Sequence, residues 1–114
     1  MRGVELPAED QKLVTLARSA LGRALVRTLP AAGAAVRDDM GRTYAAASVE
    51  VDGASVTALQ LAVASAISSG ARAFEAAAVV SADATPDEEG LTALAAFGPV
   101  STVLRARPDG TVVA

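Results

Sequence analysis

Alanine is the feature that most constrains this chain. It occupies 28 of the 114 positions, whereas only three residues are aromatic, and hydrophobic residues together make up 52%. Methyl side chains fill a core at native density only if the backbones on either side approach closely. The sequence therefore predicts a thin core between closely packed layers, in a single domain that covers residues 1–114.

Two absences restrict the chemistry. The chain contains no cysteine and no histidine. Disulfides, thiolate or imidazole metal sites, and the Ser-His or Cys-His pairs of nucleophilic catalysis are therefore excluded. No glycine-rich string precedes a predicted helix as a nucleotide fingerprint would require, and we expect neither a metal nor another cofactor.

The charge pattern restricts the partners. The net charge is −3, and nine arginines accompany one lysine, a bias typical of a high-GC bacterial genome. Nucleic acid is not an expected partner because phosphate neutralisation needs clustered cations; Arg18, Arg23 and Arg27 have the spacing of a solvated helix face. The acidic start has no apolar targeting region, and no apolar run approaches the ~20 residues of a membrane span. We expect a cytoplasmic protein without membrane contact.

The first half of the chain predicts a helix and a hairpin. Pro7, followed by acidic residues, is typical of a helix start. Apolar residues then recur at i, i+3, i+4 spacing, which predicts an amphipathic helix to about Thr28. Residues 33–36 and 43–49 have the pattern of two short strands, joined by a turn in which Gly41 takes a positive φ.

The second half alternates helices with strands. Ser55 is the predicted N-cap of a largely apolar, and hence buried, helix to Ser69. Residues 74–81 predict a strand covered on both faces. Thr85-x-x-Glu88 has the form of a capping box for a helix to about Phe97. Strands are expected at 100–105 and, as a short fifth one, at 111–114. This alternation predicts a three-layer α/β domain.

Several strings resemble the small cytidine deaminases of nucleoside salvage. The segment Gly33 to Val36, with Gly41 and Tyr44 beyond it, has the spacing of that family's Val-Gly-Ala-Ala-Leu hairpin. Ser48-Val49-Glu50 lies where the family has Asn-Val-Glu. Further along, Gly70, Phe74 and Ala78-Val79 repeat the exit from the family's first zinc helix, and residues 86–97 match the length of its second. The resemblance covers about residues 13–112 and implies an α/β/α sandwich around a mixed sheet of four to five strands.

The resemblance also implies that the zinc site is lost. The family holds zinc with residues from Cys-Ala-Glu or His-x-Glu and from Pro-Cys-x-x-Cys, and a glutamate passes the proton from the metal-bound water to the base. The first motif falls on Thr57-Ala58-Leu59 and the second on a segment that begins Pro86-Asp87 and ends at Gly90. The ligand positions therefore hold Thr57, Asp87 and Gly90, and the proton-shuttle position holds Leu59. Such a set does not retain zinc in an N/S-type site.

The positions that hold ribose in the family are half retained. Glu50 stands at the family position, whereas Ser48 replaces asparagine with a shorter group, so weak ribose binding is an open alternative. The simpler interpretation of Glu50 is a strand-end carboxylate that faces solvent or forms an ion pair. Asp87 and Glu88 suggest a second alternative, a carboxylate-metal hydrolase, although an acidic first helical turn is the simpler interpretation.

Leu59 favours loss of catalysis over a new catalytic site. A carboxylate left at this position without zinc would be an unpaired buried acid, which is costly. Leucine instead contributes about 1.5–3 kcal/mol of apolar burial if it is enclosed. We therefore expect a catalytically inactive pseudoenzyme that serves as a structural or partner-binding module. The resemblance implies a homodimer or homotetramer. A protein partner, which the sequence does not identify, is a further expectation. The alternative function is a nucleoside or nucleotide sensor.

Overall fold

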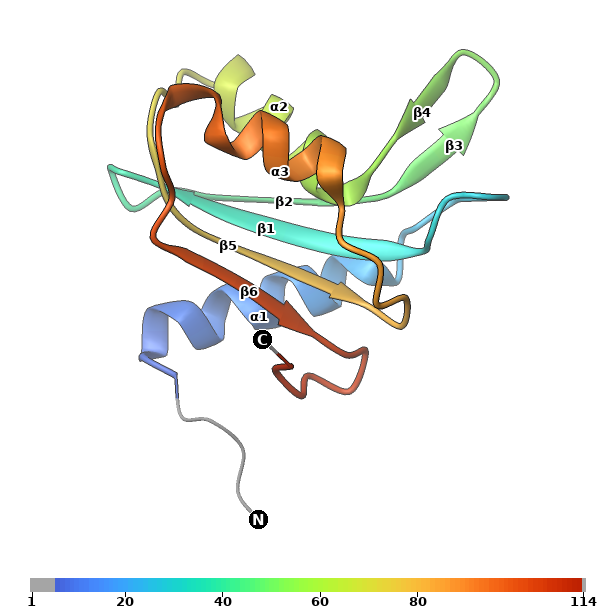
Figure 1. Cartoon of the computed structure of the whole chain (residues 1–114), viewed down its shortest axis with the longest axis horizontal. Helices are drawn as coiled ribbons and strands as arrows, with labels where there is room; N and C mark the ends of the chain where they lie inside the picture. Colours follow the sequence, from blue (N-terminus) through green and yellow to red (C-terminus); the bar gives the residue numbers. More distant parts are fainter. Residues whose placement is uncertain (1–5, 114) are drawn as a thin grey trace.

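The computed structural model describes residues 6–113 as three layers, with one helix on one face of a sheet and two on the other (Figure 1). The sheet has the strand order β2-β1-β5-β6. Its strands are β1 (Ala32–Asp38), β2 (Thr43–Ala47), β5 (Phe74–Ser81) and β6 (Thr102–Ala106). A separate hairpin consists of β3 (Val49–Val51) and β4 (Ala54–Val56). The helices are α1 (Ala8–Leu21), α2 (Ala58–Ser68) and α3 (Glu88–Leu94), and a 3-10 turn, Ala95–Phe97, extends α3.

The sheet is mixed. β1 pairs antiparallel with both β2 and β5, whereas β5 and β6 run parallel. The parallel pair is joined by α3, as a crossover connection requires. The carboxyl ends of β5 and β6 consequently lie at the same edge of the sheet, together with the start of β1 (Figure 1).

The alternation of side chains along the central strands divides the core into two layers. Ala34, Val36 and Ala77 face α2 and α3, whereas Ala35 and Ala76 face α1. This arrangement follows from the period of two in a strand. Both layers are rich in alanine, which confirms the expected thin core.

Gly33 shows how close the layers approach. A β-carbon at this position would overlap the backbone of α1 at Ala17 and Leu21. Only glycine therefore allows α1 to lie against β1 at this separation.

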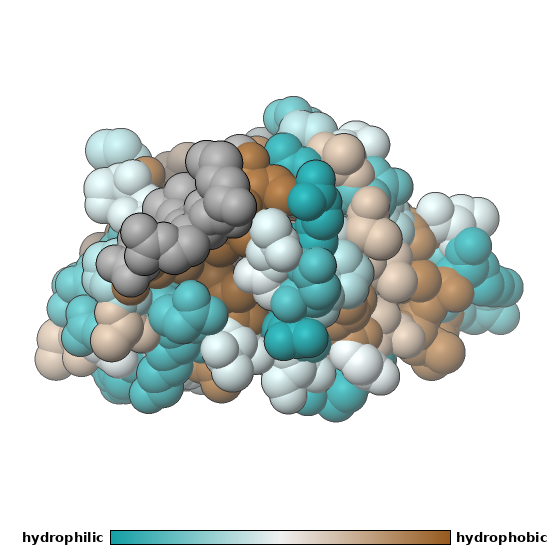
Figure 2. Space-filling model, turned by 90° about the horizontal axis from the view of Figure 1, so that it is seen from below, coloured by the Kyte–Doolittle hydropathy of each residue, from teal (hydrophilic) through white to brown (hydrophobic). Residues whose placement is uncertain are grey.

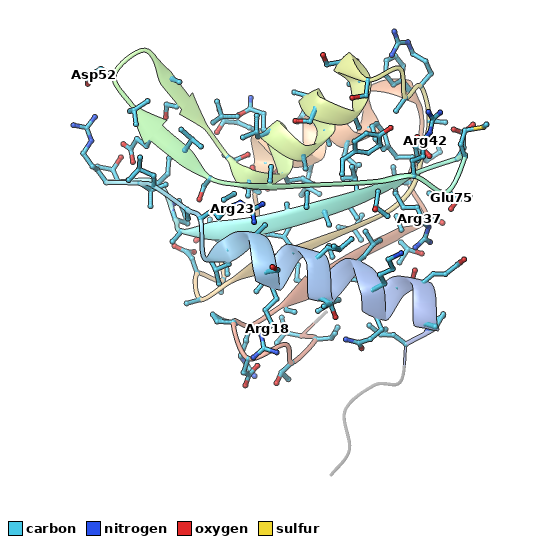
Figure 3. The ribbon with its side chains drawn as sticks, turned by 180° about the vertical axis from the view of Figure 1, so that it is seen from behind. Arg18, Arg23, Arg37, Arg42, Asp52 and Glu75 are labelled. Carbon is cyan, nitrogen blue, oxygen red and sulfur yellow. The ribbon has the colours of Figure 1, made fainter. Side chains whose placement is uncertain are left out.

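Ionic contacts join the layers at the far end of the sheet. Arg37 on β1 lies 3.1 Å from Asp10 of α1 and 2.9 Å from Glu75 of β5, and Figure 3 shows Arg37 and Glu75 at the end opposite the Asp52 hairpin tip. Asp38 is fully buried and accepts hydrogen bonds from the backbone N–H groups of Met40 and Arg42. These bonds fix the turn between β1 and β2, in which Gly41 has the expected positive φ of 82°.

Three predicted boundaries in the first half are wrong. The first helix ends at Leu21 and not near Thr28, because Leu25 leaves the helical path to pair with Val49 of β3. The second predicted strand ends at Ala47, and the chain then forms the unpredicted hairpin β3–β4. Ser55 lies within β4 and is not an N-cap; Thr57 caps α2.

The second half agrees more closely. The strand at 74–81 is confirmed, and β6 is displaced by one or two residues from its predicted position. The cap of α3 is Asp87 and not Thr85, so the predicted capping box is wrong. Within the described residues, the expected fifth strand is reduced to one bridge between Ala106 and Val112; Ala114 lies outside them.

The surface mixes polar and apolar residues. Viewed from below, brown hydrophobic residues lie among teal hydrophilic ones (Figure 2). Leu25, Met40 and Phe97 are the most exposed of the large apolar side chains within residues 6–113. In the same part of the chain, no helix has the length and the apolar character needed to cross a bilayer.

Candidate functional site at the N-termini of α2 and α3

A cavity of about 620 Å³ lies at the sheet edge where β5 and β6 end. The N-termini of α2 and α3, the loop from Ser81 to Pro86, and the segment Leu29-Pro30 before β1 surround it. In Figure 1 this edge is on the right, below the first turns of both helices. Open α/β sheets commonly bind ligands outside the carboxyl ends of their strands. This cavity is therefore the candidate site.

The predicted site residues divide into the five positions of the expected zinc site and the two positions of the expected ribose site. Thr57, Leu59, Pro86 and Asp87 all line the cavity. Gly90 lies directly behind it, against Leu59 and Asp87. The structure thus brings together all five positions at which the resemblance places the family's zinc chemistry.

Thr57 is engaged as a helix cap. Its hydroxyl accepts a hydrogen bond of 3.1 Å from the backbone N–H of Gln60, and the Gln60 side chain accepts one of 3.3 Å from the backbone N–H of Thr57. These reciprocal bonds form a capping box. Sequence reasoning missed it, although Thr57-x-x-Gln60 has the required Thr-x-x-Gln form.

Leu59 and Gly90 pack against each other. The side chain of Leu59 has no exposed surface, although it lies at the floor of the cavity. A β-carbon on Gly90 would lie 2.6 Å from the β-carbon of Leu59. Any side chain at position 90 would therefore displace α2 from α3, and the two helices depend on glycine for their close contact.

Asp87 is also engaged within the chain. Its Oδ1 accepts a hydrogen bond of 2.9 Å from the backbone N–H of Gly90 and caps α3. The neighbouring Asp83 accepts a bond of 2.7 Å from the backbone N–H of Thr85. The backbone and hydroxyl hydrogen bonds of Thr85 lower the pKa of Asp83. Both carboxylates therefore stabilise local backbone turns.

Ser48 and Glu50 do not line the cavity. The hydroxyl of Ser48 is buried, donates to the carbonyl oxygen of Pro30 and accepts from the backbone N–H of Ala32. It therefore holds the start of β1 in place.

Glu50 binds the segment that precedes β1. Its Oε1 accepts hydrogen bonds of 2.7, 2.6 and 2.9 Å from the backbone N–H groups of Arg27, Thr28 and Leu29, and its Oε2 accepts one of 2.6 Å from the Thr28 hydroxyl. The Thr28 hydroxyl, followed by these three backbone groups, lowers the pKa of Glu50 from 4.5 to about 2. Glu50 thus fixes Leu29, which forms part of the cavity wall.

Several lining residues were not foreseen from the sequence. Val79 and Ser81 on β5, and Val103 and Arg105 on β6, reach the cavity because the two strands end side by side. Val79 and Val103 carry no signal of a site, since apolar residues occur in any covered strand.

Acidic residues alone do not converge into a metal site. Within residues 6–113, no three side chains of Asp, Glu, His or Cys come together as a metal ion would require. Glu88 and Glu89 occupy the exposed first turn of α3, beside the capping Asp87.

Solved structures with the same fold are cytidine deaminases. The enzyme of Burkholderia pseudomallei superposes with a TM-score of 0.76 over 90% of this chain and 87% of its own, at 24% identity, which shows a shared fold. The cytidine deaminase of Mycobacterium tuberculosis gives 0.72 over 87% and 85%, at 26% identity. A search of curated protein sequences gives no match. The architecture is therefore the three-layer sandwich of cytidine deaminases.

The sequence supports the same class. The family described as "Cytidine deaminase-like" matches residues 6–110. The chain belongs to the cytidine deaminase-like family.

The residues present do not fit the zinc ion of the resembled enzymes. The Thr57 hydroxyl and Oδ1 of Asp87 accept from backbone N–H groups, and Gly90 has no side chain to offer a ligand atom. A cysteine at position 90 would collide with Leu59. The donor set lacks both thiolate and imidazole, which a tetrahedral zinc site of this type needs.

Proposed function

We propose that this chain is a non-catalytic member of its family, acting as a structural or partner-binding module. The supporting observation is the contact between Leu59 and Gly90, the positions to which the resemblance assigns the proton shuttle and one zinc ligand. A carboxylate in this enclosed position would have no cation to pair with it. The chain also contains no cysteine or histidine with which to hold a catalytic zinc ion.

The first test is chemical. Purified protein should contain no stoichiometric zinc and release no ammonia from cytidine or deoxycytidine. Elemental analysis and an ammonia assay measure both quantities. About one zinc per chain, or turnover that follows the protein through purification, would overturn the proposal.

The nucleoside sensor has less support. The two polar groups that the resemblance assigns to ribose, Ser48 and Glu50, are saturated by internal hydrogen bonds and lie outside the cavity. Cytidine or uridine at millimolar concentration should not raise the melting temperature. A shift that disappears in Glu50→Ala would favour the sensor instead.

The module is proposed to assemble with copies of itself. The outward face of α2 carries only small residues at its most exposed positions, Ala64, Ser65 and Ser68, and such residues allow close helix approach. We expect a dimer or tetramer by size-exclusion chromatography with light scattering. A monomer across the accessible concentration range would contradict this part of the proposal.

A further inference from the structure

The cavity beside Leu59 is large, although the residues at the positions of the family's zinc site are apolar or form hydrogen bonds within the protein. Its volume of about 620 Å³ lies within the range of roughly 300–1,000 Å³ that is typical of small-molecule sites. Leu59 fills the space between the two helices, but the cavity extends from there to the ends of β5 and β6. The site is therefore packed at its floor and hollow above it.

The polar side chains around the cavity are largely committed to hydrogen bonds within the protein. Ser81 donates to the carbonyl oxygen of Ala31, at 2.9 Å, and Arg105 donates to that of Ala84. Thr57, Asp83 and Asp87 accept from backbone N–H groups, as described above. These bonds occupy part of the polar surface that the cavity offers to a ligand.

The remaining lining is apolar. Its larger members come from five separate parts of the fold: Leu29, Pro30, Leu59, Val79, Leu91 and Val103. Acidic side chains, among them Glu88 and Glu89, outnumber Arg105 and Arg107 around the cavity. This excess disfavours an anion such as a nucleotide or a fatty acid.

We propose that this cavity binds a neutral, apolar small molecule of one or two rings. The inference rests on the proposed loss of catalysis, because a deaminating site must present polar groups to a nucleoside. Recognition comes from apolar contact with the walls.

The test uses the full chain and the neutral two-ring fluorescent probe 6-propionyl-2-(dimethylamino)naphthalene. The probe should bind saturably with one site per chain and gain fluorescence. Val79→Phe places a ring in the cavity from the central strand and should weaken binding at least about tenfold. Val103→Phe, from the edge strand, should do the same and covers the case in which one variant fails to fold.

The control is Val51→Phe, the same substitution on the exposed hairpin strand β3, outside the cavity. It should bind the probe as the parent does. Circular dichroism and thermal melting establish that each variant is folded. Equal affinity of all three variants would overturn the inference, as would displacement of the probe by cytidine.

Two further outcomes separate the possible failures. Ammonia release by the same preparation would overturn the proposed function itself, whereas absence of both ammonia release and probe binding would overturn only the inference. Probe binding that falls as the protein oligomerises would mean that a second copy of the chain covers the cavity, and it would likewise overturn the small-molecule proposal.

Discussion

Two neighbouring regions of the molecule are stabilised in different ways, one mainly by apolar packing and the other mainly by hydrogen bonds. At the N-termini of α2 and α3, stability depends on packing, since Leu59 is enclosed and Gly90 leaves room for nothing larger. Around Glu50, stability depends on hydrogen bonds, because one half-buried carboxylate holds three backbone N–H groups and a hydroxyl. The first region should respond to changes in shape and the second to changes in charge.

Hydrogen bonds within the chain hold the frame of the candidate site in place. Backbone N–H groups at helix starts need acceptors in any sequence, and Thr57 and Asp87 supply them without a metal. Glu50 likewise accepts hydrogen bonds from a segment of the chain. The residues at the positions to which the resemblance assigns functional groups thus stabilise the fold.

Leu59→Glu should have the largest effect. It removes apolar burial and places a carboxylate in an enclosed position, which together should cost at least ~2–3 kcal/mol. For a domain of this size the melting temperature should fall by roughly 10 °C. Burial raises the pKa of such an acid, so stability should recover partly at acidic pH, where the group is neutral.

Leu59→Met is the matched control for that variant. A volume-conserving apolar substitution should cost less than about 1.5 kcal/mol. Thermal melting of both variants checks the difference. If the glutamate variant melts within about two degrees of the parent at neutral pH, the floor of the cavity is solvated. Apolar packing around Leu59 would then not be what stabilises this region.

Gly90→Ala should destabilise the protein by about 1–3 kcal/mol, the usual cost of overpacking. In an exposed helix the same change would stabilise by up to ~1 kcal/mol, so the sign distinguishes close contact from simple helix propensity. Urea denaturation measures it. Gly22→Ala is the control, because its β-carbon would meet only an ordinary contact of 3.6 Å with the Ser19 carbonyl oxygen. A neutral Gly90→Ala would show that the helices can separate freely.

Thr57→Ala should cost about 1 kcal/mol, the typical value of a lost N-cap. Thr57→Ser retains the hydroxyl and should restore most of the stability. Equal loss in both variants would mean that the threonine methyl group, and not the capping bond, stabilises α2. Chemical denaturation at neutral pH resolves a difference of this size.

Glu50→Gln should lower the stability by an amount that depends on pH. The folded-state pKa of Glu50 is lowered from 4.5 to about 2, so its ionised form stabilises the fold above about 4.5, and that stability is lost as the pH falls toward 2. The parent should therefore exceed the variant at neutral pH and converge with it in acid. Urea denaturation as a function of pH checks this. A difference that is constant with pH would contradict the hydrogen-bonded carboxylate.

The matched control is Glu89→Gln, on the exposed first turn of α3. The same loss of charge there leaves the loop before β1 untouched. Its unfolding curve should shift less than that of Glu50→Gln at neutral pH.

The strands and the layer order were predictable where local pattern and packing agree. Residues 74–81 form an uninterrupted apolar strand covered on both faces, and the structure gives the same bounds. The first helix was predicted too long because Leu25 continues the helical spacing of apolar residues. Its pairing with Val49, distant in the chain, overrides that local pattern.

The site was predictable only in part for a related reason. The resemblance located the five positions around the helix starts, and they do lie together. The partners of Glu50 are backbone N–H groups, which every residue but proline carries, so no sequence pattern marks them. The cavity depends on strand ends meeting in space and has no local signature.

The strand order has a consequence for how quickly this chain folds. β1 and β2 are joined by a short turn and can pair early, since they are close in sequence. By contrast, β2, the β3–β4 hairpin and α2 lie between β1 and β5 in the chain, so the pairing of β1 with β5 closes a long loop. Contacts of such sequence separation slow folding because loop-closure entropy is lost before they form. The central pair of strands should therefore be the last part of the sheet to protect its amides from hydrogen exchange during refolding.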